Sequence, residues 1–155
     1  MKIRWVGAAL LLWSILLSTA MAQAGPGGNS GAERMLFQAL NRERQAQGLP
    51  SLRWDSALAS AARQHAATMA SERSVEHTLP GEPSLPGRAT RAGAHFSWLS
   101  ENIVASSDAA QAHSAFMHSP NHRANILDTD MDSVGIGAIE RGGQLYVVED
   151  FSKAK

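Results

Sequence analysis

The chain has 155 residues, no cysteine, and 14 basic against 14 acidic side chains. This length is enough for one compact domain with its own core, and the missing cysteines exclude disulfides, thiolate catalysis and cysteine-ligated metal sites. The balanced charge, with no block of lysine or arginine, gives no electrostatic support for binding nucleic acid or another polyanion.

The first 24 residues have the pattern of a secretory signal peptide. Lys2 and Arg4 precede an apolar run from Val6 to Leu17, and Ala22-Gln23-Ala24 fits a signal-peptidase site. The run is short for a membrane-spanning helix. We expect cleavage after residue 24, with cleavage after residue 22 as the alternative, and a secreted or periplasmic product without a membrane span. The glycine-rich residues 25–31 are expected to form a flexible leader to a single domain.

Two amphipathic helices are predicted at the start of this domain, which we place at residues 32–152. Residues 32–47 carry apolar side chains at helical spacing, and Gly48 follows where a left-handed C-cap belongs. Asp55 can cap a second helix that runs to about Ser71. The link between the helices is expected to place three apolar side chains in the core: Leu49, Leu52 and Trp54.

The middle of the chain is less regular. Residues 78–93 are rich in proline, glycine and arginine and have no pattern that assigns them to a helix or a strand. Residues 98–106 are predicted to form a short strand. Ser107 can cap a third helix that ends at His118.

The sequence of the last third of the chain predicts a short helix and a β-hairpin. Ser119 and Pro120 suit the start of a helix in the stretch "SPNHRANIL". Two β-rich runs, residues 133–140 and 144–151, flank a Gly-Gly turn and indicate a β-hairpin. The order of elements favours an α+β domain in which helices cover an antiparallel sheet.

Six histidines are the feature that points to chemistry. We expect His65 to be a partly buried residue of the second helix, His113 to face solvent, and His95 to lie in the irregular loop. The other three lie at or just outside helix ends, where functional side chains often occur: His77, His118 and His122. The motifs of serine hydrolases, phosphate-binding loops, dinucleotide sites and zinc proteases are absent, and no serine is singled out as a nucleophile.

Six stretches identify a family resemblance. In chain order they are "LNRERQAQGLPSLRWDSALASAARQHAATMA", "EHT", "SENIVAS", "SPNHRANIL", "VGIGAI" and "LYVVEDF", and they cover roughly Glu33 to Phe151. In this order they resemble the CAP superfamily of cysteine-rich secretory, antigen 5 and pathogenesis-related proteins, and most closely its cysteine-free bacterial branch. The resemblance implies a three-layer α-β-α sandwich with a broad cleft over a small antiparallel sheet.

The resemblance also implies a cleft lined by two histidines and two acidic residues. His77 in "EHT" matches the first histidine, Glu101 in "ENI" matches one carboxylate, and His122 matches the second histidine. The second carboxylate follows an aromatic residue matched by Phe116, but the stretch "FMHSPNH" contains no acid. His118 either fills this gap or is an exposed residue near the end of a helix.

These residues predict a metal site. Imidazole-rich sets favour zinc, copper or nickel over calcium and magnesium. We expect His77, His122 and Glu101 to bind a divalent metal, zinc first, with His118 as a further candidate ligand. A position in the first turn of a helix disfavours a charged imidazolium at His122, and metal binding requires the neutral form.

Three functions remain open at this point. The first is a secreted binding module for a divalent metal and an extended ligand such as a peptide, glycan or lipid. The second is a hydrolase that uses a metal or the histidine and glutamate side chains directly. The third is a structural envelope protein with a vestigial cleft. We favour the binding module, because no nucleophile and no oxyanion hole are identified and fold alone is weak evidence for activity.

Overall fold

The computed structural model describes residues 30–154, so the expected signal peptide (1–24) and residues 25–29 of the expected leader lie outside the described residues. The elements in chain order are α1 (Gly31–Ala46), β1 (Arg53–Trp54), α2 (Ser56–Glu72), α3 (Leu85–Arg91), β2 (Trp98–Ser106), α4 (Ala109–His118), α5 (Pro120–Ile126), β3 (Ser133–Arg141) and β4 (Gln144–Lys153). Within residues 30–154, no helix has the length and apolar character needed to cross a membrane.

Helix α1 begins within the stretch expected to be a leader. Ser30 is its N-cap, and the side chains of Ser30 and Glu33 each accept a hydrogen bond from the other's backbone N–H. This capping box satisfies two backbone donors that would otherwise have no partner at the start of the helix. The first helix therefore starts at Gly31, one residue before the position expected from the sequence.

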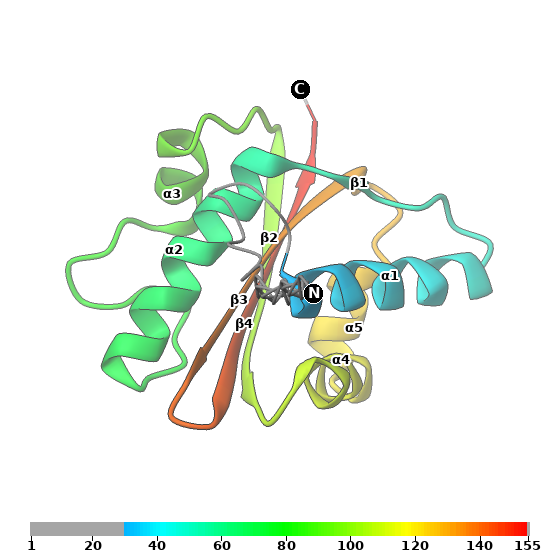
Figure 1. Ribbon diagram of the computed structural model, residues 1–155. Coiled ribbons are helices and arrows are strands. Elements are labelled where there is room, and N and C mark those ends of the chain that lie inside the picture. Colours follow the sequence, from blue (N-terminus) through cyan, green and yellow to red (C-terminus); the bar gives the residue numbers. More distant parts are fainter. Residues whose placement is uncertain (1–29, 155) are drawn as a thin grey trace, which may run out of the picture.

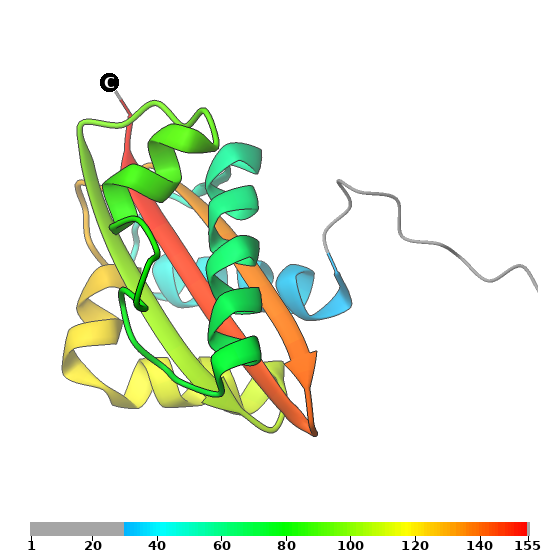
Figure 2. The ribbon, with the colours of Figure 1, turned by 90° about the vertical axis from the view of Figure 1, so that its left-hand side faces the viewer.

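The strands form the middle layer of a three-layer sandwich. Their order is β1-β3-β4-β2, with β4 between β3 and the edge strand β2. Helices α2 and α3 cover one face, and α1, α4 and α5 lie on the other (Figures 1 and 2). Strands β2, β3 and β4 are antiparallel, but the two-residue β1 runs parallel to β3. The α+β sandwich is confirmed, with a mixed sheet in place of a purely antiparallel one.

Each face of the sheet has its own hydrophobic core, because successive side chains of a strand point to opposite faces. The core beneath α1, α4 and α5 contains Leu36, Leu40, Leu52, Ala109, Ala112, Phe116, Ile126, Met131, Val134, Ile136, Leu145, Val147 and Phe151. The core beneath α2 contains Ala62, Ala66, Met69, Ala70, Leu79, Ile103, Tyr146 and Val148.

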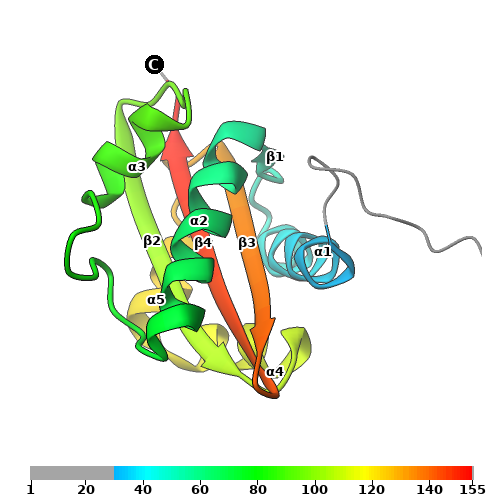
Figure 3. The same ribbon diagram turned by 60° about the vertical axis from the view of Figure 1, so that its left-hand side comes forward.

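Helix α2 lies so close to β3 that two positions of the strand have no room for a side chain. A Cβ atom on Gly135 would lie 2.0 Å from the backbone nitrogen of Ala59. A Cβ atom on Gly137 would lie 2.3 Å from the carbonyl carbon of Ala62. Figure 3 shows α2 running over the sheet at this contact. The glycines of "VGIGAI" therefore permit the helix and the sheet to pack backbone against backbone.

Some local expectations differ from the structure. Residues 78–93 include α3, a single seven-residue helix too short to show a hydrophobic period in the sequence. The N-cap of α4 is Asp108 and not Ser107, because the Asp108 carboxylate accepts the backbone N–H of Gln111 at 2.9 Å.

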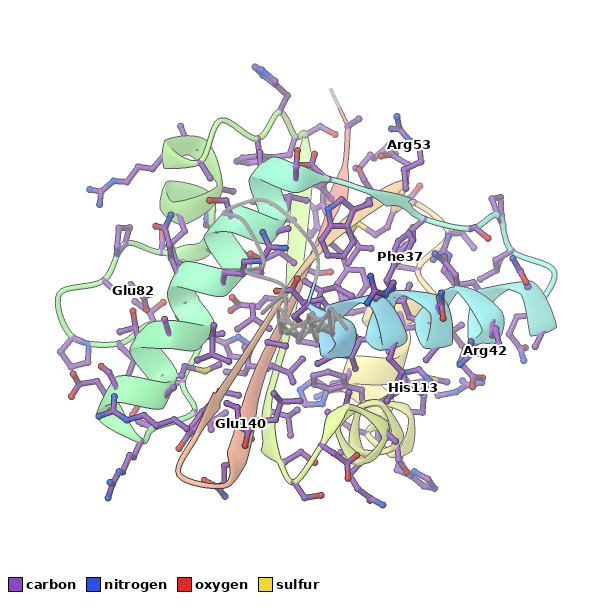
Figure 4. All side chains as sticks on the ribbon, viewed as in Figure 1. Phe37, Arg42, Arg53, Glu82, His113 and Glu140 are labelled. Carbon is purple, nitrogen blue, oxygen red and sulfur yellow. The ribbon has the colours of Figure 1, made fainter. Side chains whose placement is uncertain are left out.

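The three apolar residues of the link between α1 and α2 are buried to different degrees. Leu52 belongs to the core, whereas Leu49 and Trp54 are half-buried. The Trp54 ring packs edge-on against Phe37 of α1, with 5.4 Å between ring centroids (Figure 4 labels Phe37).

The contact between α2 and β3 generates a stability prediction. Gly137→Ala forces a methyl group against the backbone of α2, and we expect it to lower the free energy of unfolding by about 1–3 kcal/mol or more. Gly31→Ala is the control, because among residues 30–154 a Cβ atom there meets nothing within 4 Å. Denaturant unfolding of both variants measures the difference. Equal stability of the Gly137 variant and the parent would contradict the close packing of α2.

Candidate functional site

The expected site lies at the outer edge of β2. His77, in the loop after α2, donates a hydrogen bond from Nδ1 to Oε1 of Glu101 at 2.8 Å. A carboxylate only accepts, so Nδ1 is the nitrogen that donates in this contact, and Nε2 is the nitrogen not used by it. Glu101 in β2 is buried, and its other oxygen accepts a hydrogen bond from Arg88 of α3. The His77 side chain is 61% exposed, so its free nitrogen is accessible.

His122 approaches the same edge from the helical layer on the other face. It lies in the first turn of α5, and its ring packs edge-on against Phe116 of α4 with 5.3 Å between centroids. Burial lowers the pKa of His122, and repulsion from His77 in its protonated form lowers it further. The imidazole is therefore kept neutral, as expected from the sequence, but burial and a second histidine are the causes in place of the helix terminus.

Two asparagines that the sequence analysis did not single out hold α5 against β2. Asn102 is fully buried, and its Nδ2 donates to the backbone carbonyl of His122 at 3.1 Å and to Glu149 at 3.2 Å. Asn125 of α5 donates to Oδ1 of Asn102 at 2.8 Å. These contacts fix the backbone that carries His122. Their only signal in the sequence was membership of the "SENIVAS" and "SPNHRANIL" stretches.

A buried polar pair lies behind Glu101. His65 of α2 is fully buried, not partly buried as expected, and its Nδ1 donates to Glu82 at 2.8 Å. Its Nε2 lies 3.8 Å from the carboxylate of Glu101. Figure 4 labels Glu82 in the loop beside α2. In the sequence, the burial of His65 was indicated by its place among the alanines of the second helix. Its partner Glu82 could not be identified, because residues 78–93 have no regular pattern.

Arg88 connects this pair to the loop that carries His77. Its guanidinium is 4% exposed and donates to the backbone carbonyls of His77 and Pro83, at 3.1 Å each. The same group pairs with Glu101 and lies 3.9 Å from Glu82. A planar guanidinium has five donors and is always charged, so one side chain can satisfy two carboxylates and two carbonyls. Arg88 therefore fixes both members of the His77–Glu101 contact.

The remaining histidines lie apart from this contact. His118 is exposed and its Nδ1 donates to the backbone carbonyl of Ser114 at 2.7 Å; in the described part of the chain no hydrogen bond or ion pair joins it to His77 or His122. His113 was expected to face solvent, but it does not. Its side chain is 14% exposed and lies 3.7 Å from Glu43 of α1, and burial lowers its pKa (Figure 4).

The donor set at the edge of β2 differs from the expected metal site. Among residues 30–154 no three histidine, aspartate or glutamate side chains are grouped so that together they hold a metal ion. Both oxygens of Glu101 are engaged, one by His77 and one by Arg88. Glu101 is therefore placed to orient His77.

Two buried acidic residues of β4 lie beneath the site. Burial raises the pKa of Glu149 to about 8, although a hydrogen bond from Asn102 opposes this shift. Burial and the nearby carboxylate of Glu101 raise the pKa of Asp150 well above its usual range. Asp150 is paired with Glu101 in the register of β2 and β4. Glu149 is thus protonated at neutral pH.

The buried ion pair of Arg88 predicts a large mutational effect. Arg88→Met leaves Glu101 buried without its cation and frees two backbone carbonyls, so we expect the free energy of unfolding to fall by about 3–5 kcal/mol. Arg91→Met is the matched control, because Arg91 is exposed on the same helix. Thermal and denaturant unfolding measure both variants. Similar small losses in the two would mean that Arg88 does not hold the site.

Glu149 predicts a specific pH dependence of stability. The unfolded chain ionises this carboxyl near its ordinary pKa of 4.5, whereas the folded chain keeps the proton up to about pH 8. Stability therefore falls as the pH rises through this window, by at most about 1.4 kcal/mol per pH unit. Glu149→Gln removes the contribution, so its unfolding free energy should fall less between pH 5 and pH 8.

The control for this experiment is Glu140→Gln, which changes an exposed glutamate of β3 (Figure 4). Its unfolding free energy should follow that of the parent at every pH. If the Glu149 variant also runs parallel to the parent, Glu149 ionises normally in the folded protein.

Comparison with known proteins identifies the family. A sequence profile of CAP, the cysteine-rich secretory protein family, matches residues 37–151. The uncharacterized protein YkwD of Bacillus subtilis (strain 168) is 29% identical over 125 residues, which cover 80% of this chain and 49% of that protein. This chain thus spans about half the length of that curated relative.

Two solved structures are similar in fold. An extracellular protein containing an SCP domain from Bacillus anthracis str. Ames is 27% identical with a TM-score of 0.74, over 79% of this chain and 40% of that one. An outer surface protein from Borrelia burgdorferi is 22% identical with a TM-score of 0.75, over 83% of this chain and 96% of that one. With its sequence match, its three-layer fold and no cysteine, the chain belongs to the CAP family, in the cysteine-free bacterial branch.

Proposed function

We propose that this chain is an exported binding module whose His77–His122 site at the edge of β2 takes a divalent cation, zinc first, together with an extended ligand. The observation that carries the proposal is the convergence of His77 and His122 on one sheet edge from opposite helical layers. Each is held by separate buried contacts: Glu101 and Arg88 for His77, and Asn102 for His122.

The protonation of the two rings supports metal binding. His77 donates a hydrogen bond from Nδ1 to Glu101, so Nε2 is the nitrogen that would bind a metal. A carboxylate in this position raises the basicity of a metal-binding imidazole. His122 has a lowered pKa and stays neutral. Imidazole nitrogens suit zinc, copper or nickel, whereas calcium and magnesium prefer oxygen ligands. Glu101 would orient His77 and not bind the ion itself.

An ion held by two protein nitrogens keeps several coordination positions for water and for ligand atoms, as open zinc sites do. This is why the proposal joins the metal to a second ligand. Export is proposed from the pattern of residues 1–24, and the related proteins described as extracellular or outer-surface support it. A periplasmic or a secreted location fits the same pattern.

Calorimetric titration of zinc into the purified protein tests the site. We expect zinc to bind at about pH 7.5, calcium to bind far more weakly, and zinc binding to weaken below about pH 6 as the histidines take up protons. The double variant His77→Ala/His122→Ala should lose zinc binding and keep its fold, because His77 is mostly exposed.

The matched control is His95→Ala/His118→Ala, which removes two exposed imidazoles outside the site. It should bind zinc like the parent. A parent that binds no zinc at neutral pH, or a His77/His122 variant that binds it equally well, would contradict the proposal. Peptide, ester and glycan substrates incubated with the zinc-loaded protein should remain intact, and turnover that a chelator abolishes would favour a hydrolase instead.

A further inference from the structure

A separate groove lies at the start of the same edge strand. Its volume is about 480 Å³, and it is lined by Ser97, Trp98, Asp128, Asp130 and Lys153. Trp98 is 63% exposed, the highest value among the large exposed hydrophobic side chains of residues 30–154. Its indole is the sole apolar side chain of the lining, and carboxylates, an ammonium group and a hydroxyl surround it.

One wall of the groove is the loop between α5 and β3, and it is fixed from inside the protein. Arg44 of α1 is 1% exposed, and its guanidinium donates to the backbone carbonyls of Ile126, Asp128 and Met131 at 2.9, 2.8 and 3.4 Å. The side chain of Asp128 accepts the backbone N–H of Asp130 at 2.8 Å. The two carboxylates are therefore carried by a preorganised backbone, which lowers the entropy lost on binding.

The other wall is the end of the pair formed by β2 and β4. The backbone N–H of Ser97 donates to the carbonyl of Lys153 at 2.8 Å, and Trp98 is paired with Lys153 in the strand register. The ammonium group of Lys153 lies 3.3 Å from a carboxylate oxygen of Asp130. Hydrogen-bond acceptors and a donor thus lie on both sides of one exposed aromatic ring.

We propose that this groove is a carbohydrate-binding subsite in which a pyranose ring stacks on Trp98. A sugar presents an apolar face of C–H groups, which suits an indole, and hydroxyls that donate and accept hydrogen bonds. Asp128 and Asp130 accept from such hydroxyls, and Lys153 donates to them. A lipid chain would need a longer apolar lining, two carboxylates repel a polyanion, and Lys153 opposes a simple cation.

The groove and the His77–His122 site contact the same strand, β2. Trp98 and Asn102 are four residues apart on β2, so they face the same side of the sheet about 13 Å apart. Asn102 holds the backbone of His122. At this spacing a sugar ring stacked on Trp98 lies apart from the two imidazoles, so mutation can separate the two sites. The inference goes beyond the proposed function, because the stacking subsite itself needs neither a metal nor the two imidazoles.

Calorimetric titration with cellotetraose and with chitotetraose tests the subsite. We expect at least one of them to bind, Trp98→Ala to weaken this binding about tenfold or more, and Trp98→Phe to retain it within about threefold. Met35→Ala is the matched control, because Met35 is also an exposed apolar residue but lies on α1 outside the groove. Circular dichroism checks that every variant is folded.

The His77→Ala/His122→Ala variant separates this inference from the metal proposal. It should bind the tetrasaccharide within about threefold of the parent, whether or not the parent binds zinc. Loss of sugar binding in this folded variant would assign the sugar to the His77–His122 site and overturn the Trp98 subsite. The inference also fails if the parent binds neither sugar at about 10 mM, if Trp98→Ala binds as the parent does, or if choline chloride binds where the sugars do not.

Discussion

The backbone contact between α2 and β3 is the constraint on which the rest of the structure depends. Gly135 and Gly137 leave no side chain between the helix and the sheet, so the position of α2 has almost no freedom. His65 is a buried residue of α2, and the loop that carries His77 begins at the C-terminal end of this helix. A bulkier strand would move α2 outward and separate His65 from the Glu101 side of the sheet.

Two buried arginines, on opposite faces of the sheet, each hold a loop by hydrogen bonds to its backbone carbonyls. Arg88 binds the backbone carbonyls of the loop that carries His77, and Arg44 binds those of the loop that carries Asp128. Irregular loops have backbone groups that no regular ladder satisfies, and a buried guanidinium supplies several donors at one point. Each candidate binding surface therefore includes a loop that buried side chains hold in place, which gives that loop a fixed recognition geometry.

The sequence has no acidic residue after Phe116, and the structure shows what positions His122 in its place. The resemblance implied a second carboxylate near His122, but here the ring of His122 packs on Phe116 and its backbone is held by Asn102. Behind Asn102 lies Glu149, a carboxyl that burial keeps protonated at neutral pH. His122 is thus positioned by packing and by amide hydrogen bonds, without a charged partner of its own.

The sequence by itself determined the long elements, because hydrophobic period and capping chemistry are local: α1, α2 and the hairpin follow from residues within one or two turns of each other. The family motifs indicated His77, Glu101 and His122, but not how they are supported. The supporting contacts join residues far apart in the chain, such as Arg44 to Met131 across 87 positions. No local pattern encodes such pairs, so the burial of His65, the short helix α3 and the groove at Trp98 were decided by tertiary packing alone.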